Sequence, residues 1–581
     1  MICAPCLDTP PPPAWACARR CGRNGRCGHT LCGPDVDALA PGLFRGFVLP
    51  YLRCALCFSL VAVASAALPT ASQEESSTAW HGVWRIASTS TSLLVTIVLA
   101  RAALIRPVTL GGGGDCSVDE AALARCLGNA DAYAERLGGA IRCKTISSSE
   151  PGEPTVDRSE MLRLHAHLEQ SFPRVHTALT RRVVNEYSLL YEWRGSADAS
   201  ELPYLISAHL DVVPVEPEHW SEDPFGGEVK HGSVWGRGAI DDKQAVMGHL
   251  EAVEDLLAHG FTPRRTVYFA FGHDEEQGGE QGAKRIASLL ASEGVTLEFL
   301  LDEGLFVIDG VVPSFPRPVA MICVAEKGNL CVELTVEAGE SGHSSAPPKE
   351  GAISILADAL VRLHRAPFPP HADSLQLLFG ALRGGFKWPM QMIVSNLWLF
   401  MPLLRAVLAS KPKTATLVRT TTALTVIRAG SRSNVLPVYA SAVANFRIHP
   451  ADSVTSILAR LKTVIRDERV KLRTLLATEP SPVSSPDHPA FADLAACVRA
   501  IFPSAAVAPG LFVAASDSKH YWNLAPQIFR FNPVTLHRDE TSMFHGHNER
   551  ISVRNHAQCV AFFRAFHLKQ SARSVPRREV G

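Results

Sequence analysis

The stretch Tyr204-Leu205-Ile206-Ser207-Ala208-His209-Leu210-Asp211 decides the fold class. It is an apolar run of strand length that ends at a histidine, and an aspartate follows two residues later. In open α/β sheets, side chains at the carboxyl ends of the strands line the ligand-binding edge. We therefore expect His209 at that edge, with Asp211 orienting its imidazole as a carboxylate commonly does for a metal-bound histidine. Alone, His-x-Asp is a weak signal, because most instances are surface coincidences.

The segments that follow this stretch alternate between helix and strand patterns. Lys243–His259 has apolar residues at helical spacing, Thr266–Phe271 is rich in β-formers, and Leu297–Leu301 is another apolar run. This alternation favours an α/β layer architecture. The pattern changes near Ala325–Val336 and resumes after about residue 450, which predicts a catalytic domain interrupted by a smaller inserted domain. The expected segments are a leader (1–115), a first catalytic segment (116–328), a lid or dimerisation domain (329–449), a second catalytic segment (450–570) and a tail (571–581).

The leader differs in composition from the rest of the chain. Eight of the 15 cysteines lie within its first 57 residues, at spacings that match no standard zinc-ligand pattern. Its apolar stretches, Cys54–Leu68 and Ser92–Ile105, are shorter than the roughly 20 residues of a membrane span. We expect at least one of them to be a signal or a membrane anchor, so that the protein enters the secretory pathway and is membrane-anchored, vacuolar or secreted. The alternative is a leader that is absent from the mature protein.

Overall composition is that of an ordinary globular protein. The 581 residues are 46% hydrophobic and 20% charged, and 57 Lys and Arg balance 57 Asp and Glu. Nucleic-acid-binding domains are typically basic. We therefore expect no nucleic-acid partner and a small-molecule substrate instead.

Four further motifs carry acids or histidines, several of them just after expected strands. They are Trp235-Gly-Arg-Gly-Ala-Ile-Asp241-Asp242-Lys243, Gly272-His-Asp-Glu275-Glu276, Leu301-Asp302-Glu303-Gly304 and Phe544-His545-Gly-His547-Asn-Glu549. Each has a simpler interpretation alone, such as helix capping or a solvated acidic loop. Together they form a set of nitrogen and oxygen ligands that suits zinc, with manganese or cobalt as alternatives. Two metals bridged by one carboxylate can polarise a carbonyl.

The order of these motifs resembles the aminoacylase/carboxypeptidase family of dinuclear zinc hydrolases. Within that family the match is nearest to the branch that contains carboxypeptidase S and the N-fatty-acyl-amino acid synthase/hydrolase. Further matching segments are Gly342–Pro348, Arg419–Thr425, Asn434–Pro437 and Asn445–Pro450. The resemblance covers residues 118–568. It implies a zinc-peptidase-like α/β catalytic domain, with a mixed sheet flanked by helices, interrupted by a smaller α+β lid domain.

The resemblance also implies two Zn²⁺ per subunit and a role for each ligand. Asp241 would bridge the ions, and the peptide after it would be cis. His209 and Asp302 would complete one ion site, and Glu276 and His545 the other. As catalytic residues, Glu275 would be the general base and Asp211 would support His209.

In the lid, three residues resemble substrate-binding positions. His343 is similar to a histidine that stabilises the oxyanion, often from the other subunit of a homodimer formed by the lid. Asn434 and Arg447 resemble residues that bind polar groups of the substrate, and the planar fork of Arg447 suits a carboxylate. For His343, the plain alternative is a turn histidine.

Two positions depart from the family pattern or leave it ambiguous. Lys519 stands where relatives usually have arginine, and lysine lacks the bidentate fork. His547 lies two residues after His545, so the ligand assignment could shift, although the spacing His-Gly-x-Asn-Glu favours His545. The apolar segment Met390–Leu408 is interpreted as a buried lid helix, with a pocket for a long acyl chain or a membrane contact as the alternative.

The sequence thus predicts a zinc-dependent amidohydrolase. The leading hypothesis is hydrolysis of N-acyl amino acids, with condensation as the reverse reaction. The alternatives are a metallocarboxypeptidase that acts on small peptides and an inactive family member with a binding role.

Overall fold

The fold is built on a mixed eight-stranded sheet. The computed structural model describes residues 73–104, 120–148, 156–196, 201–339 and 341–573. In spatial order the strands are β1 (Thr180–Val184), β2 (Ser188–Trp193), β6 (Val267–Gly272), β3 (Tyr204–His209), β7 (Leu300–Asp309), β16 (Ile528–His537), β8 (Val319–Glu326) and β15 (Ala506–Phe512). The strands β6, β3, β7 and β16 run parallel, whereas β2 and β8 run antiparallel to their neighbours within this group. The predicted mixed sheet is confirmed.

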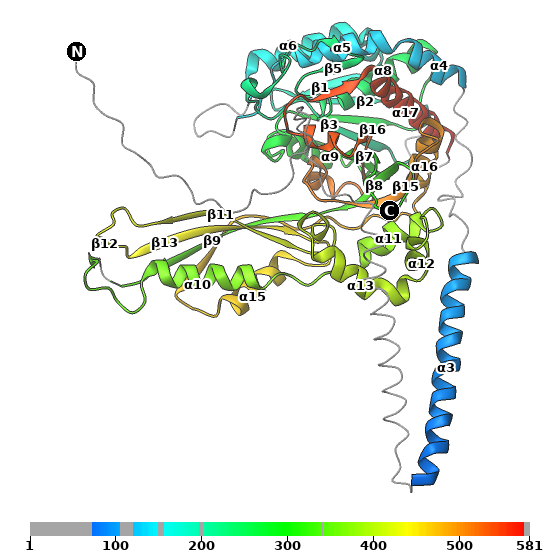
Figure 1. Ribbon diagram of the computed structural model, residues 1–581. Helices are drawn as coiled ribbons and strands as arrows, with labels where there is room; N and C mark the ends of the chain where they lie inside the picture. Colours follow the sequence, from blue (N-terminus) through cyan, green and yellow to red (C-terminus); the bar gives the residue numbers. More distant parts are fainter. Residues whose placement is uncertain (1–72, 105–119, 149–155, 197–200, 340, 574–581) are drawn as a thin grey trace, which may run out of the picture.

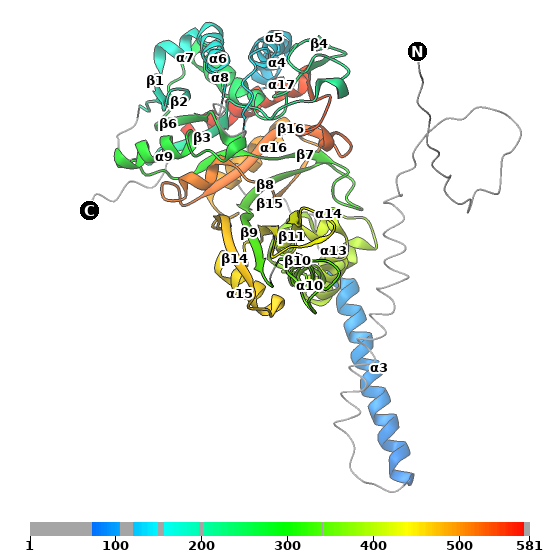
Figure 2. The same cartoon turned by 90° about the vertical axis from the view of Figure 1, so that its left-hand side faces the viewer.

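Helices cover both faces of this sheet, as two orthogonal views show (Figures 1 and 2). The largest hydrophobic cluster joins one face to α4 (Glu120–Gly128), α5 (Ala130–Ile141), α6 (Arg158–Ser171), α7 (Pro173–Ala178), α8 (Lys243–Ala258), α16 (Pro489–Ile501) and α17 (Val553–Ala572). A second cluster packs α9 (Ala283–Ser292) and the 3-10 turn η5 (Asp517–Tyr521) against the other face. Strands such as β3 and β6 are therefore buried along their whole length, which fixes the position of the residues at their ends.

The eight-stranded sheet and the helices on its two faces form the larger unit of the protein. The lid is a separate four-stranded antiparallel sheet that projects from this larger unit (Figure 1). Its order is β11 (Thr421–Ala429), β13 (Tyr439–Ile448), β9 (Gly328–Glu337) and β14 (Val470–Thr478), and α10 (Ala352–Arg365) and α15 (Val454–Ile465) pack on one face. A two-stranded ladder of β10 (Gly342–His343) and β12 (Val435–Leu436) lies at its far end. Because β14 pairs with β9, the lid continues to Thr478, and the boundary expected at residue 449 is about one helix and one strand too early.

A helical insert connects the lid to the larger unit. It comprises α11 (Asp373–Leu382), α12 (Met390–Ser395), α13 (Leu397–Ala409) and α14 (Pro412–Ala415), and it packs in a hydrophobic cluster with residues of β8 and β15. The apolar segment Met390–Leu408 is therefore largely buried, as the plainer interpretation expected, although against the larger unit rather than the lid sheet.

The helix α3 (Gln73–Leu104) contains most of the second apolar stretch of the leader. Val98 belongs to the cluster of the helical insert, and its carbonyl accepts a hydrogen bond from Asn396 Nδ2 at 3.0 Å. Among the described residues, no helix combines the length and the apolar character needed to cross a membrane. The stretch Cys54–Leu68 and the N-terminal cysteines lie outside the described residues.

Candidate metal centre

His209 is the last residue of β3, at the carboxyl edge of the sheet. Its Nδ1 lies 3.0 Å from the backbone carbonyl of Asp211, so that Nδ1–H donates and Nε2 is left to face the interior of the site. The Asp211 carboxylate lies 3.4 Å from the same nitrogen and accepts hydrogen bonds from the backbone amides of Glu275 and Glu276, at 3.1 and 3.2 Å. Asp211 thus orients both the histidine and the glutamate pair.

Asp241 lies in a tight loop that precedes α8. The peptide bond between Asp241 and Asp242 is cis, as the family resemblance implied. Gly238 in the same loop has φ of 92°, which favours glycine. The buried Glu549 carboxylate accepts hydrogen bonds from the backbone amides of Gly238, Ile240 and Asp241, and from Arg237 Nη1 at 2.5 Å. Glu549, from the motif Phe544–Glu549 near the C-terminus, therefore fixes the shape of the loop that carries Asp241.

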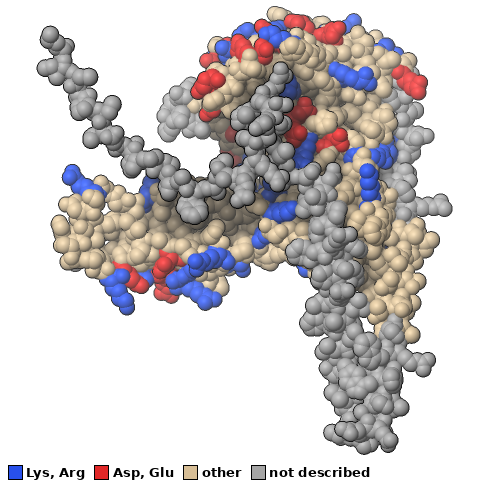
Figure 3. Space-filling model, in the orientation of Figure 1, with Lys and Arg blue, Asp and Glu red and all other residues tan. Residues whose placement is uncertain are grey.

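The two carboxylate oxygens of Asp241 face different histidines. Oδ1 lies 3.1 Å from His209 Nε2, and Oδ2 lies 2.8 Å from His545 Nε2. His545 Nε2 is also 3.3 Å from Glu276 Oε1. This is the arrangement expected of a carboxylate that bridges two cations, with one imidazole on each side. Figure 3 shows Asp and Glu side chains in the recess between the larger unit and the lid.

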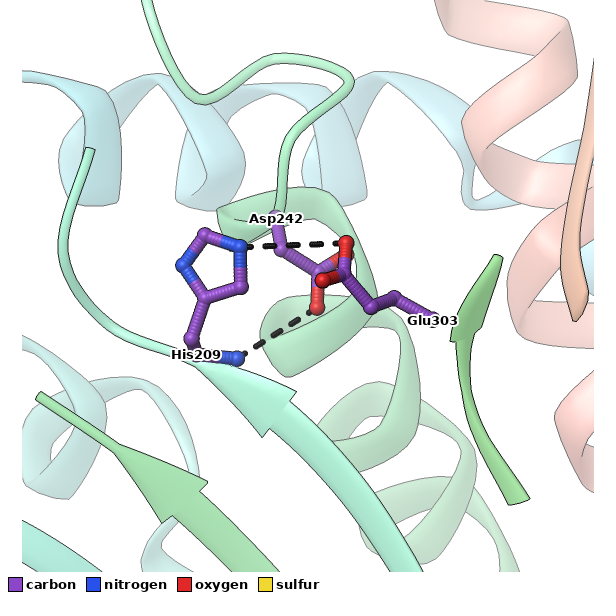
Figure 4. A group of neighbouring side chains, drawn as sticks. All are labelled: His209, Asp242 and Glu303. Atoms are coloured by element: carbon purple, nitrogen blue, oxygen red, sulfur yellow. Dashed lines mark hydrogen bonds and ion pairs between the residues drawn. The ribbon is translucent and has the colours of Figure 1, made fainter. Parts of the chain in front are cut away.

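On the His209 side, the second carboxylate is Glu303 rather than Asp302. Glu303 Oε2 lies 3.8 Å from His209 Nε2, and Asp242 Oδ2 lies 3.4 Å from the His209 backbone nitrogen (Figure 4). Asp302 instead accepts a hydrogen bond from the Ser518 amide at 2.8 Å. Adjacent strand residues point to opposite faces, so only one of the pair can reach His209. The expectation that Asp302 completes this ion site is therefore wrong.

Electrostatics agree with a cation site. Burial raises the pKa values of Glu303 and Asp242 well above the usual carboxyl range, and neighbouring carboxylates add to the effect. Burial also raises the pKa of Asp241, but hydrogen bonds from the two histidines outweigh this and hold it well below its usual range. Hydrogen bonds to Asp241 and then Glu276 raise the pKa of His545 to about 10.

Several acids share this small volume, and two groups of potential ligand atoms, each within 4.8 Å of one another, contain His209. One group is completed by Asp242 and Glu303, and the other by Asp241 and Glu276. Imidazole nitrogens and carboxylate oxygens at such spacing fit zinc chemistry. The donor set therefore fits the metals that the sequence implied.

Glu275 lies beside this group on the 3-10 turn η4 (Glu275–Gln277). Burial raises its pKa well above the usual value, with contributions from the nearby Asp517 and Glu276 carboxylates. Such a pKa suits a group that must take up a proton and release it again. Lys519 lies close to the end of the same turn, since its Nζ is 3.7 Å from where a Cβ on Gly278 would stand.

The three lid residues are not brought together. His343 lies in β10 and is exposed, and the Asn434 carbonyl accepts a hydrogen bond from the Ser344 amide at 3.1 Å, so both lie at the far end of the lid. Arg447 lies at the other end, on β13 opposite Asn329 of β9. Of the three, Arg447 alone is at the end of the lid nearest the larger unit.

The sequence did not predict the roles of three residues in the centre. The roles of Glu303, Asp242 and Glu549 appear only when strand orientation and loop packing are known, although all three were part of quoted motifs. The alternation of side chains along Leu301–Gly304 could have raised Glu303 as a competitor of Asp302. His547 faces His219 rather than Asp241, so His545 is the histidine that belongs to the centre.

Comparison with known proteins identifies the class. Residues 205–569 match the family model described as peptidase family M20/M25/M40. This protein belongs to that family. The predicted class of enzyme, a zinc-dependent hydrolase, is confirmed by this membership.

The relatives narrow the comparison. The chain is 43% identical over 427 residues to the N-fatty-acyl-amino acid synthase/hydrolase PM20D1 of Xenopus tropicalis, covering 72% of this chain and 82% of the relative. It is 41% identical over 439 residues to the probable carboxypeptidase S-like 2 of Dictyostelium discoideum, covering 75% and 84%. The M20 family metallo-carboxypeptidase Sso-CP2 from Sulfolobus solfataricus has the same fold, with a TM-score of 0.55, 17% identity and coverage of 76% and 99%. Both branches expected from the motifs are thus represented.

Proposed function

We propose that this protein hydrolyses the amide bond between an acyl group and an amino acid, and forms the same bond in the reverse direction. The single observation that carries the proposal is the Asp241 carboxylate, which lies between His209 and His545 with Glu275 beside it. The similarity to N-fatty-acyl-amino acid synthase/hydrolases favours an acyl-amino acid substrate.

Two zinc ions per subunit would be held by this chain's own residues. His209 and Glu303 would hold one ion, Glu276 and His545 the other, and Asp241 both. Bound there, zinc would polarise the scissile carbonyl and lower the pKa of the attacking water. Asp211 and Glu549 keep the ligands in place through the backbone of Glu275–Glu276 and of the Asp241 loop.

Glu275 is the general base of the proposal. Its carboxylate accepts the proton of the attacking water and delivers it to the leaving nitrogen, which departs as the amine of the free amino acid. In the reverse direction the same carboxylate takes a proton from the amine. Both directions require Glu275 to take up a proton and to release it again. A raised pKa brings this carboxyl group closer to the working pH, where its protonated and ionised forms differ less in free energy.

The substrate carboxylate would be bound by cationic side chains on either side of the centre. Arg447 offers a planar fork from the lid, and Lys519 offers a point charge beside η4. Because Asn434 and His343 lie at the far end of the lid, they would serve the centre of a second subunit in a homodimer formed through the lid. The exposed strand β11, at the edge of the lid sheet, supports such pairing.

A metallocarboxypeptidase is the second candidate, favoured by the similarity to carboxypeptidase S-like proteins. Both activities use the same metals and base, and only the substrate pocket differs. An inactive binding protein is disfavoured, because the ligand set and Glu275 are both present.

The test compares turnover of N-oleoyl-phenylalanine with turnover of glycyl-leucine by the zinc-loaded full chain. We expect faster cleavage of the first substrate. Preference for the dipeptide would move the protein to the carboxypeptidase class.

Entry into the secretory pathway is also proposed, and it rests on the apolar stretches of the leader.

A further inference from the structure

The 3-10 turn η5 carries Lys519, one of the two cationic residues proposed to bind the substrate carboxylate. The turn has only five residues, so hydrogen bonds within it do little to fix its orientation. At its far end, His520 Nε2 lies 2.8 Å from the Gly278 carbonyl oxygen, which joins the turn to η4. The contacts that hold the beginning of the turn therefore decide where Lys519 is presented.

A buried glutamate on a neighbouring strand supplies these contacts. Glu326 is the last residue of β8, and it pairs with Phe512 of β15, the strand that precedes η5. Its carboxylate accepts hydrogen bonds from the Ser516 hydroxyl at 2.8 Å, the Ser516 amide at 3.3 Å and the Ser518 hydroxyl at 3.1 Å. Ser518 directly precedes Lys519 in the chain. Glu326 thus anchors the first half of the turn to the sheet.

Arg530 completes this cluster. Its side chain is fully buried, and its Nε donates to Glu326 Oε2 at 2.8 Å and to the Ser518 hydroxyl at 2.9 Å. Its two Nη atoms have no hydrogen-bond partner in the described part of the chain. A buried ion pair contributes little to stability, because the cost of desolvation offsets the attraction between the charges. What the pair positions is therefore a better account of it than what it stabilises.

We propose that Glu326 is a positioning residue for substrate binding, because it holds η5 so that Lys519 faces the carboxylate of the substrate. Lysine is a point charge on a flexible stem, so its contact with a carboxylate depends on where the backbone places it. Arg530 fixes the orientation of Glu326 through Nε. The inference rests on the proposed function, since only a substrate with a free carboxylate requires Lys519.

The test is a double-mutant cycle on the zinc-loaded full chain, with Glu326→Gln, Lys519→Met and the two together. We expect Glu326→Gln to raise KM for N-oleoyl-phenylalanine at least about tenfold and to leave kcat within about twofold, because a binding contact to a charged group is lost. Lys519→Met should also raise KM. In that background Glu326→Gln should have no further effect, since its target is gone. Equal effects of Glu326→Gln in both backgrounds would overturn the inference.

Glu298→Gln is the control for loss of stability. Glu298 is also buried and also pairs with a buried arginine, but both of its arginine partners, Arg265 and Arg573, lie outside η5. This variant should lower the thermal unfolding midpoint without raising KM. A rise in KM as large as that of Glu326→Gln would overturn the inference, because loss of stability alone would then explain both variants.

Amide hydrogen exchange provides a measurement that requires no turnover. Exchange of residues 516–521 should be faster in Glu326→Gln than in the wild type, because the Ser516 amide and hydroxyl then face an uncharged acceptor. Ser518→Ala is a milder change and should accelerate exchange less, in the same direction. Unchanged exchange in both variants would overturn the inference. If the wild type cleaves only glycyl-leucine, the proposed function fails, but the cycle can be run on that substrate, which also ends in a free carboxylate.

Discussion

Glu549 accepts a hydrogen bond from the backbone amide of Asp241, at 3.2 Å, although the two residues are 308 positions apart in the chain. The same carboxylate oxygen accepts from the amides of Gly238 and Ile240. A single buried side chain from the C-terminal segment thus holds the loop that presents the bridging carboxylate. Mutation of residues that support metal ligands in this way commonly weakens metal affinity or activity.

Replacing Glu549 with Gln should weaken zinc binding by about 10- to 100-fold. The amide keeps one acceptor oxygen, but it cannot balance the charge of the buried Arg237, whose Nη1 donates to Glu549. Competition with a chelator measures the affinity. Glu540→Gln is the control, since this half-buried acid lies in the nearby turn η6 (Glu540–Met543) and accepts a hydrogen bond from the His537 amide, away from the metal ligands. Unchanged zinc affinity in Glu549→Gln would contradict the role assigned to it.

Glu303→Gln and Asp302→Asn distinguish the two adjacent acids of β7. We expect Glu303→Gln to bind one zinc fewer per chain, because its carboxylate faces His209. Asp302→Asn should keep the full zinc content, because Asp302 accepts hydrogen bonds from the Ser518 and Glu303 amides instead. Metal analysis of the purified variants decides between them. The reverse pattern would restore Asp302 as the ligand.

His556 makes the fold sensitive to acid. Burial lowers its pKa from 6.5 to about 3, and neither ring nitrogen has a hydrogen-bond partner in the described part of the chain. The unfolded chain therefore binds a proton that the folded chain does not, so stability is present above pH 6.5 and is lost as the pH falls toward 3. At pH 5 the loss is about 2 kcal/mol, from 1.5 pKa units at 1.36 kcal/mol each.

The variant His556→Leu should remove this loss. Its thermal unfolding midpoint should change less between pH 7.5 and pH 5 than that of the wild type. His259→Leu, at an exposed position, should behave like the wild type. An unaltered pH response in His556→Leu would show that other groups dominate acid unfolding.

His343→Ala tests whether the lid serves a second subunit. His343 lies at the far end of the lid, so the variant should lose activity while it keeps its zinc. Mixing His343→Ala with Glu275→Gln chains should restore about a quarter of the wild-type activity, because half of the random dimers then contain one complete site. No recovery after subunit exchange would place His343 outside a shared centre.

The order of motifs along the chain was enough to predict the sheet, the inserted lid and most residues around the metal centre. Buried strands that end in histidine or acids leave little freedom for those side chains, as His209 at the end of β3 shows. What the sequence could not decide depends on orientation. Asp302 and Glu303 are chemically interchangeable in a motif, and only the pleat of β7 separates them.

The extent of the lid was missed for a related reason. The strand β14 (Val470–Thr478) lies at the edge of the lid sheet. Its pairing with β9 joins segments that are far apart in the sequence, and no local pattern indicates such a contact. The helical insert likewise resembles a lid segment in sequence, but its apolar residues are buried against β8 and β15.

Turnover of N-oleoyl-phenylalanine by Glu275→Gln, measured together with its zinc content, tests the proposed mechanism most directly. We expect the variant to keep its zinc, because Glu275 is not among the ligands. We also expect kcat to fall by about 10²- to 10⁴-fold, as is usual when a general base is removed. Full zinc content with undiminished kcat would contradict Glu275 as the base and the mechanism built on it.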